Sequence, residues 1–292
     1  MIQNVTGVSV MVLGTMQDGG LPHIGCRCAR CAAARADQRL SRLVACLALI
    51  DWRWPAPAVW LIDATPDIGR QLDLLGEALG PHPQRPERLR QPDGIFLTHA
   101  HLGHIGGIPQ LGPEAMAAEN LPVYGTAALL SLLKENALWR PAVSALALTT
   151  IEPHTPIQLG KGLVVTAVPV PHRDEWGAGT VAYQIDGLRR SLLYVPDIDD
   201  WGQWPQAEAK IAAVDMALLD ASFYSTRELD GRQLPVHPLV PDTLQRFGRL
   251  STRLILTHFN HTNPLLDADS PEREAVEKAG IEVAAEGMVL AL

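Results

Sequence analysis

Hydrophobic residues in this chain gather in short runs that are closed by glycine, proline or acidic residues. Such runs predict β-strands that are buried on one or both faces. The first run alternates and ends in glycine, which predicts an edge or hairpin strand. The predicted strands are Val5–Gly14, Leu43–Asp51, Val59–Ala64, Gly94–Leu97, Pro122–Gly125, Ala145–Ile151, Ile157–Leu159, Leu163–Val170, Thr180–Ile185, Ser191–Val195, Met216–Leu219, Arg253–Thr257 and Met288–Leu292.

Helical patterns lie between many of these strands. Thr65 and Pro66 suit a helix start, with Thr65 as the N-cap and Pro66 at the first helical position. The segment Gly80–Pro92, rich in proline and arginine, predicts a loop. Helices are predicted from the cysteine cluster to about Arg39, from Thr65 to about Leu79, over His104–Glu119 with interruptions at Pro109 and Pro113, over Thr126–Asn136, from Asp200 to about Ala213, and over Asp242–Arg249 and Pro271–Ala279.

Ionisable side chains follow several of the predicted strands. His99, His101 and His104 come within six residues, directly after the strand Gly94–Leu97. Imidazole is the commonest protein ligand for zinc and similar metals, and open sheets bind ligands beyond the carboxyl ends of their strands. Taken singly, each of these residues also fits a turn or a surface position, so the prediction of a metal centre rests on their recurrence. The other strand ends with candidate ligands are Asp63, His172, Asp197, Asp220 and His258.

Three cysteines crowd into the segment Cys26-Arg27-Cys28-Ala29-Arg30-Cys31. Thiolates at this spacing can converge on one tetrahedral zinc and leave the fourth position for a ligand from elsewhere. The alternative is three ordinary cysteines in a loop. Cys46 lies inside an apolar strand and is expected in the core.

Composition narrows the class of protein. A chain of 292 residues with 47% hydrophobic content can bury a large core. The net charge of −8 and the pI near 5.7 argue against a nucleic-acid partner. We expect neither a secretory signal nor a membrane partner, because apolar runs such as Val44–Trp52 are about half the length that spans a bilayer. These features predict a soluble cytoplasmic protein.

The order of the candidate ligands resembles that of the metallo-β-lactamase-fold hydrolases, and within them the branch of coenzyme PQQ synthesis protein B and its relatives. The resemblance implies a single domain over residues 1–292, an α/β (α+β) four-layer αβ/βα sandwich with metals at the edge between two mixed sheets. The segments that carry it are the His99-x-His101-x-x-His104 cluster, Gln17–Cys26, Val170–Glu175, Pro196–Asp199 and His258–Pro264.

The same resemblance implies two metal positions in the active site. His99, His101 and His172 would hold one metal. His104 and His258 would hold the second, Asp197 would bridge both, and Asp63 would orient a histidine.

The cysteine cluster resembles that of the phosphodiesterase of the C–P lyase pathway. This implies one structural zinc in a knuckle at about residues 15–36, held by Cys26, Cys28, Cys31 and His261.

Gly103 departs from the family's H-x-H-x-D-H motif, in which an aspartate ligates the second metal and positions water. We therefore expect one firmly held divalent metal and a second that is weak, exchangeable or absent. Zinc is the expected metal, with iron or manganese as alternatives. Asp174, Asp199 and Asp220 are candidate substitutes for the aspartate. The glycine is also expected to open space beside the metal.

Three hypotheses for function follow. The first is a metallo-hydrolase that directs a metal-activated water at a small ester, lactone or phosphodiester, with Asp197, His258 and Asp63 as catalytic residues. The second is an iron-dependent oxidation of a modified amino acid or peptide, and the third is a non-catalytic binding or carrier protein. Arg227, Arg232 and His237 could meet an anionic group of the substrate, but they are expected to be solvated surface. A homodimer is also open, because Trp52, Trp54, Trp201 and Trp204 could line an interface or cover the core.

Overall fold

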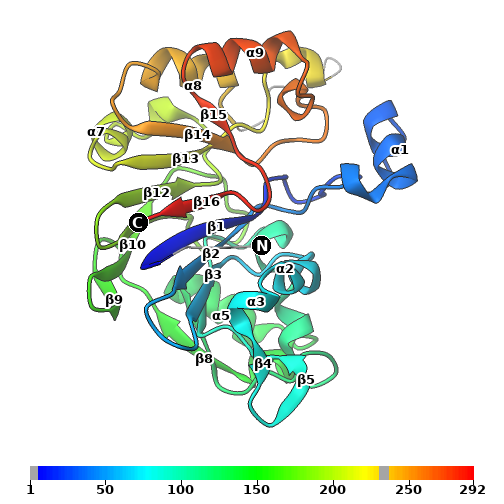
Figure 1. Cartoon of the computed structure of the whole chain (residues 1–292), viewed down its shortest axis with the longest axis vertical. Coiled ribbons are helices and arrows are strands. Elements are labelled where there is room, and N and C mark those ends of the chain that lie inside the picture. Colours follow the sequence, from blue (N-terminus) through cyan, green and yellow to red (C-terminus); the bar gives the residue numbers. More distant parts are fainter. Residues whose placement is uncertain (1–5, 230–236) are drawn as a thin grey trace.

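Two seven-stranded mixed sheets form the centre of the computed structural model, which describes residues 6–229 and 237–292 (Figure 1). The first sheet has the order β16 (Val289–Ala291), β1 (Val8–Gly14), β2 (Cys46–Asp51), β3 (Ala58–Ile62), β6 (Gly94–Phe96), β7 (Leu121–Gly125) and β8 (Leu146–Thr150). The second has the order β15 (Glu282–Val283), β14 (Arg253–Thr257), β13 (Met216–Asp220), β12 (Ser191–Val195), β11 (Val181–Asp186), β10 (Leu163–Pro169) and β9 (Pro156–Gly160).

Helices cover the outer face of each sheet, which makes four layers. The first sheet carries α2 (Ile68–Leu74), α3 (Gly76–Leu79), α4 (Leu102–Ile105), α5 (Ala127–Glu135) and α6 (Arg140–Val143). The second carries α7 (Ala207–Ala212), α8 (Val240–Phe247) and α9 (Pro271–Lys278). The four-layer sandwich predicted from the sequence is therefore confirmed.

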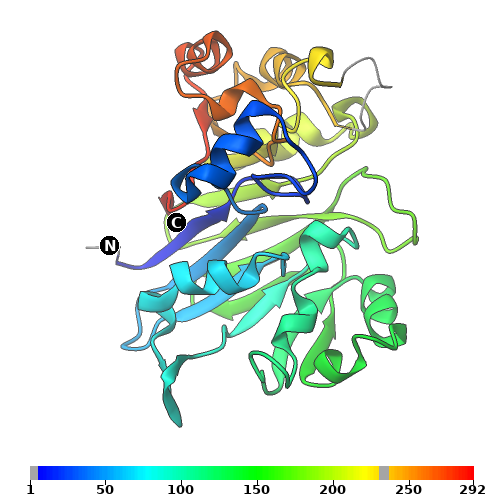
Figure 2. The ribbon, with the colours of Figure 1, turned by 90° about the vertical axis from the view of Figure 1, so that its right-hand side faces the viewer.

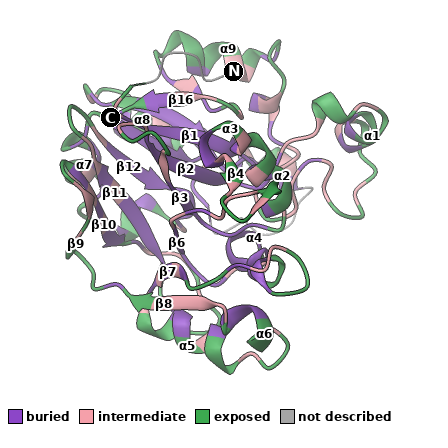
Figure 3. Ribbon diagram, turned by 60° about the horizontal axis from the view of Figure 1, so that its bottom comes forward, coloured by how far each residue is buried: buried purple, intermediate pink, exposed green. Residues whose placement is uncertain are grey.

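Three apolar cores hold the layers together, one between the sheets and one under each set of helices. Along β1, Val10 and Val12 face the second sheet while Met11 and Leu13 face the helices, because side chains alternate along a strand. Most central strands are thus buried on both faces, as the purple strands of Figure 3 show. This burial explains why their sequences read as continuous apolar runs.

The first and last described strands lie side by side. β16 pairs antiparallel with β1, which also pairs with β2, so β1 is an inner strand and not the expected edge strand. The reason is the return of the chain from β15 in the second sheet to β16 in the first. Val5 lies outside the described residues.

Strand directions bring the ends of distant strands to one edge of the sandwich. In the first sheet, β3 and β6 are parallel, and β1 runs with them because two antiparallel pairings separate it from β3. In the second sheet, β12, β13 and β14 are parallel, and β10 runs with them for the same reason. Segments that follow these strands can therefore meet.

The helices differ more from prediction than the strands do. The helix expected over His104–Glu119 is only α4 and a 3₁₀ turn, Ile108–Leu111, because Pro109 begins a new turn. The segment after Asp200 is a 3₁₀ turn and then α7, since Pro205 interrupts it. The helix after Thr65 divides into α2 and α3. Within Gly80–Pro92, expected as a loop, β4 (Pro81–His82) and β5 (Arg85–Leu89) form a hairpin.

One helix stands beside the sandwich. Helix α1 (Ala29–Ala36) projects from the side of the molecule, in front of the second-sheet half in Figure 2. Arg30 in α1 donates a hydrogen bond of 2.8 Å to the backbone carbonyl of His261, after β14. No helix within the described residues is long and apolar enough to cross a membrane. Trp201 and Trp204 belong to the core, whereas Trp54 is exposed.

Candidate functional site

A cluster of imidazoles and carboxylates lies at the shared edge of the two sheets. The loop after β6 brings His99, His101 and His104, and the segments after β10, β12 and β14 bring His172, Asp197 and His258. Of these, His99, His104, Asp197 and His258 are at most 3% exposed. The residues predicted from the histidine motif and from the strand ends thus meet in one place.

Three of the histidines form the outer part of the cluster. Nδ1 of His101 lies 2.9 Å from Nε2 of His99 and 3.3 Å from Nε2 of His172. The opposite ring nitrogens point at other groups. Nε2 of His101 lies 3.1 Å from the Glu175 carboxylate, and Nδ1 of His172 lies 2.8 Å from the Asp199 carboxylate.

Asp197 lies between this trio and the two remaining histidines. Its Oδ2 is 3.0 Å from Nε2 of His104 and 3.2 Å from Nε2 of His258, and its Oδ1 is 3.6 Å from Nε2 of His172. One carboxylate thereby reaches both halves of the cluster. Its position is the one that a bridging ligand would take.

Partners outside the cluster determine the orientation of the rings. Asp63 receives a hydrogen bond of 2.6 Å from Nδ1 of His104 and another from the Thr98 hydroxyl, which in turn accepts one from Nδ1 of His99. On the other side, the Ser222 hydroxyl donates to Asp220 and accepts from Nδ1 of His258. The Nε2 atoms of these three rings therefore carry lone pairs that face the cluster.

Three buried polar atoms at the centre make no hydrogen bond of good geometry with any described residue, although the two nitrogens lie 3.0 and 3.2 Å from the oxygen: Nε2 of His104, Nε2 of His258 and Oδ2 of Asp197. Buried polar atoms in folded proteins nearly always have partners. Convergent nitrogen lone pairs around a carboxylate match the donor set of a divalent metal. The residues present therefore fit a metal ion.

Charge in the cluster shifts the protonation of its members. Burial alone would raise the pKa of Asp197, but the imidazoles of His258 and His104 lower it well below its usual range. Burial lowers the pKa of His99 well below its usual value, and the neighbouring imidazoles add to this effect. Burial would also lower the pKa of His104, but the Asp63 and Asp197 carboxylates raise it well above its usual value. A metal ion bound there would displace the proton from this ring, because histidine binds metals in its neutral form.

Asp18, which the analysis of strand ends overlooked, also reaches the cluster. Its Oδ1 lies 3.7 Å from Nε2 of His104. Candidate ligand atoms of Asp18, His104 and His258 all lie within 4.8 Å of one another. The expectation that Gly103 opens free space is wrong, because Asp18 fills that space. The rule that ligands follow strand ends could have found it, since Asp18 comes soon after β1.

His237 was expected at the solvated surface, and this is also wrong. The residue is 8% exposed, and its Nδ1 lies 2.7 Å from the Asp220 carboxylate. Burial would lower the pKa of His237, but Asp220 raises it above its usual value. No local sequence signal marks His237, because it follows no strand directly. Arg227 lies in a 3₁₀ turn, and Arg232 lies outside the described residues.

A cavity of about 230 Å³ opens onto the cluster. Its wall combines the metal-ligand candidates with Arg173, Phe223 and Asn260. Arg173 is half-exposed and brings a positive charge to the wall. The cavity can thus admit a small molecule with an anionic group.

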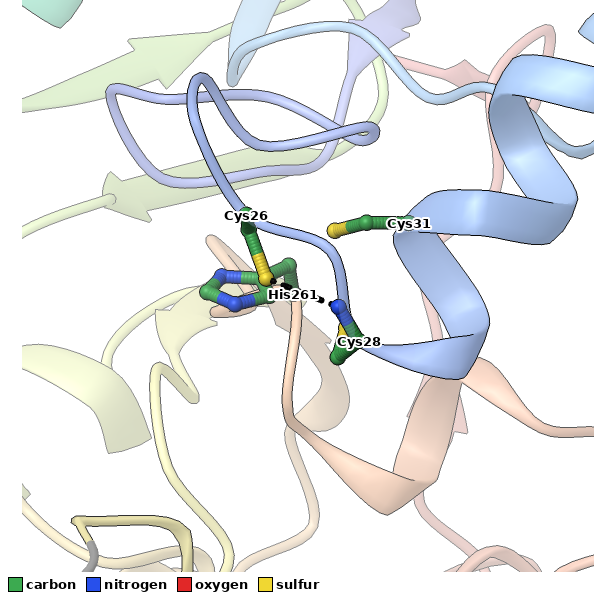
Figure 4. Close-up of side chains that lie close together, drawn as sticks. All are labelled: Cys26, Cys28, Cys31 and His261. Carbon is green, nitrogen blue, oxygen red and sulfur yellow. Dashed lines mark hydrogen bonds between the residues drawn. The ribbon is translucent and has the colours of Figure 1, made fainter.

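The cysteine cluster forms a second site beside the first. Cys26, Cys28, Cys31 and His261 converge, with all candidate ligand atoms within 4.8 Å of one another (Figure 4). The backbone N–H of Cys28 points at Sγ of Cys26, 3.4 Å away. Ligand atoms bound to one zinc lie about 2.0–2.3 Å from it, so this grouping fits a tetrahedral ion. Cys46 is buried in the core, as predicted.

Comparisons with known proteins agree with this geometry. Residues 60–259 match the Beta-lactamase superfamily domain. Coenzyme PQQ synthesis protein B from Cupriavidus necator is 29% identical, over 97% of this chain and 99% of that protein. The corresponding protein from Methylobacterium nodulans is 28% identical, over 98% and 100%.

Solved structures show the same likeness. Zn²⁺-bound PqqB from Methylobacterium extorquens has a TM-score of 0.81 and 25% identity, covering 97% of this chain and 100% of that one. A diphosphatase from the PhnP family has a TM-score of 0.66 and 23% identity, covering 97% and 96%, and supports the fold alone. With a domain match over more than half of its length and these relatives, the chain belongs to the beta-lactamase superfamily and has the metallo-β-lactamase fold.

Proposed function

We propose that this protein is a metal-dependent hydrolase that cleaves a small ester, lactone or phosphodiester. The observation that carries the proposal is the buried group of imidazole nitrogens and one carboxylate oxygen without hydrogen-bond partners among the described residues. His99, His101 and His172 would hold one divalent ion, His104 and His258 a second, and Asp197 would bridge them. Zinc is the expected metal, in keeping with the Zn²⁺-bound relative.

When bound, a divalent ion would lower the pKa of a coordinated water to about 7 and would polarise the oxygen of the bond under attack. The protein's own residues orient the imidazoles through Asp63, Asp199 and Ser222, so that each ring presents the required nitrogen.

His237 is the group in this proposal that exchanges a proton with the substrate. Its Nδ1 donates to Asp220, and its Nε2 lies 3.3 Å from the side-chain nitrogen of Gln17 at the wall of the cavity. In the neutral ring, Nε2 is thus the acceptor and the atom that would take up a proton. A raised pKa suits a group that donates a proton to a departing alcohol near neutral pH. Arg173 would attract the anionic part of the substrate.

The decisive experiment combines elemental analysis with hydrolysis of chromogenic esters, lactones and phosphodiesters. Wild-type protein, purified without added metal, should hold metal beyond one zinc at the knuckle and hydrolyse at least one probe. His172→Ala should lose metal and at least about 100-fold in rate. His154→Asn, an exposed control with φ of 62° that asparagine tolerates, should match wild type. Zinc at the knuckle alone would overturn the proposal.

The knuckle belongs to the same proposal as a structural zinc site. Burial and the neighbouring thiols raise the pKa of the Cys31 thiol to about 11, so a bound cation is needed to hold it as a thiolate near neutral pH. This zinc would join α1 and the segment before it to His261 and so stabilise the loops beside the active site.

A second function is favoured by the relatives named coenzyme PQQ synthesis protein B, which match along nearly the whole chain. In that case the histidines and Asp197 would hold iron and support oxidation of a modified amino acid or peptide. Metal identity separates the two functions. Iron in the histidine cluster of protein purified from unsupplemented cells, without hydrolysis of any probe, would favour oxidation.

A further inference from the structure

Gly103 lies against the side chain of a residue far away in the sequence. A Cβ atom at position 103 would come within 1.9 Å of Oδ1 of Asp18 and 2.7 Å of its Cα. Both distances are shorter than carbon side chains tolerate. A side chain at position 103 and the observed position of Asp18 are therefore mutually exclusive.

The residues just before Asp18 are held by hydrogen bonds to the segments that follow β13 and β14. The backbone N–H of Gln17 donates to the carbonyl of Phe259 at 3.0 Å, and the N–H of Phe259 donates to the carbonyl of Thr15 at 2.8 Å. The Gln17 side chain accepts a 2.7 Å bond from Asn260 and donates to Ser222 at 3.0 Å. Asp18 thus stands next to Phe259 and Asn260, which follow β14 and His258.

The carboxylate of Asp18 faces the side of the cluster that has unpartnered atoms. Candidate ligand atoms of Asp18, His104 and His258 all lie within 4.8 Å of one another. Nε2 of both histidines is buried and has no hydrogen-bond partner among the described residues. Two buried nitrogen lone pairs beside a carboxylate form a donor set for a cation, and Oδ2 of Asp197 completes it.

The aspartates that were expected to replace the motif carboxylate are engaged elsewhere. Asp174 accepts hydrogen bonds from the backbone of its own loop, at Trp176 and Gly179. Asp199 lies against Nδ1 of His172, and Asp220 binds His237 and Ser222. Asp18 is the carboxylate that faces Nε2 of His104 together with Asp197.

We propose that Asp18 supplies, from the loop after β1, the carboxylate that the family motif carries at position 103. The second metal would then be held by Asp18, His104, His258 and Asp197. This inference rests on the proposed metal centre and changes its expected strength, because the second position has two carboxylates and is not weakened by Gly103.

Metal binding by matched variants tests the inference. Asp18→Asn keeps the size of the side chain and removes its charge. Asp18→Gly combined with Gly103→Asp returns the carboxylate to the motif position, with three successive glycines at positions 18–20 to absorb the remaining contact of 2.7 Å at Cα. Asp73→Asn, on the exposed face of α2, makes the same charge change away from the site. The probe is Mn²⁺, titrated into metal-stripped protein whose knuckle has been refilled with one equivalent of zinc.

Wild type and Asp73→Asn should bind two Mn²⁺ ions and show the exchange-coupled electron paramagnetic resonance signal of a bridged pair. In Asp18→Asn the dissociation constant of one ion should rise by at least about 10–100-fold, and the coupled signal should be lost. Replacing even a residue that only hydrogen-bonds to a metal ligand weakens metal binding by this factor. The double variant should recover the coupled pair.

The possible failures are distinguishable. Two ions bound equally well by wild type and Asp18→Asn would overturn the role of Asp18 and leave the proposed hydrolase standing. One ion in wild type, unaffected by Asp18→Asn, would do the same. Wild type without any bound Mn²⁺ or zinc in the histidine cluster would overturn both proposals.

Discussion

Side chains in the site act in pairs: a histidine faces the cluster, and a second residue hydrogen-bonds to its Nδ1 and fixes the orientation of the ring. Asp63 is the most constrained of the residues that fix a ring in this way. It is fully buried, has φ of 74°, and accepts hydrogen bonds from Thr98 and His104. Aspartate and asparagine tolerate this left-handed backbone better than most residues.

Two replacements of Asp63 should therefore distinguish its effect on the orientation of the His104 ring from its effect on the stability of the fold. Asp63→Asn keeps the backbone but removes the charge behind His104, so metal affinity measured by calorimetric titration should fall about 10–100-fold. Asp63→Ala should in addition lower the free energy of unfolding by about 1–3 kcal/mol, because buried donors lose their acceptor. Unchanged affinity in Asp63→Asn would show that His104 needs no such support.

His237 is the residue whose role is easiest to mistake for that of a ligand. If it exchanges a proton with the substrate, His237→Gln should lower kcat/KM for the best probe by about 10²–10⁴-fold. Its metal content by elemental analysis should equal that of wild type. Loss of a metal ion from this variant would instead make His237 a ligand, with Asp197, Asp220 and His258 as its neighbours.

Residue-level prediction from the sequence worked where a local motif or a strand end marked the residue. His99, His101 and His104 are close in sequence, and His172, Asp197 and His258 come within three residues of a strand end. Asp18 comes only a few residues after β1, and the search of strand ends stopped short of it. His237 carries neither mark. Their positions follow from long-range packing, with Gln17 hydrogen-bonded to residues more than 200 positions away.

At the scale of elements, strands were predicted better than helices for a physical reason. Central strands such as β1, β2 and β13 are buried on both faces, so their sequences are clear apolar runs. The helices are short and are stabilised by packing, and prolines divide two of those predicted as continuous. The hairpin β4–β5 has mostly exposed side chains and leaves no apolar pattern.

The knuckle is the element whose removal should have the widest effect. Cys28→Ser should lose one zinc by elemental analysis and lower the Tm by roughly 5 °C or more, because a ligand at 100 times its Kd contributes about 2.7 kcal/mol. Cys46→Ala, a change in a core cysteine, should keep the wild-type zinc content. Equal zinc in Cys28→Ser and wild type would refute the structural site.

Across the whole molecule, polar contacts also join the two sheets at the end of the sandwich opposite the histidine cluster. Asp51 at the end of β2 binds Arg53, and Arg53 donates a 2.6 Å hydrogen bond to the carbonyl of Lys161, in the turn between β9 and β10. Burial would raise the pKa of Asp51, but Arg53 lowers it below its usual value. Protonation of Asp51 would therefore weaken its ion pair with Arg53 and, through Arg53, the contact between the two sheets.

The sign of this linkage gives a pH-dependent prediction. A carboxyl with a lowered folded pKa contributes stability above its unfolded pKa of about 3.9, and that stability is lost as pH falls through the folded value. Asp51→Asn should cost about 1–3 kcal/mol in urea unfolding at pH 7, and less below pH 4. Asp73→Asn is the control. An equal cost at pH 7 and pH 3 would contradict a charge effect.

The overall architecture was predictable chiefly through family resemblance, since strand order within a sheet has no local signature. That β16 pairs with β1 could not be read from either strand, because both are short apolar runs that fit several neighbours.

This closure governs when the protein can mature during its synthesis. Ribosomes deliver Asp18 and the three knuckle cysteines early, whereas His258, His261 and β16 emerge near the end. Neither candidate metal site can be completed on a nascent chain before β14 has been made. A cell short of zinc would therefore accumulate full-length chains with the sheets formed and the thiols of Cys26, Cys28 and Cys31 open to oxidation.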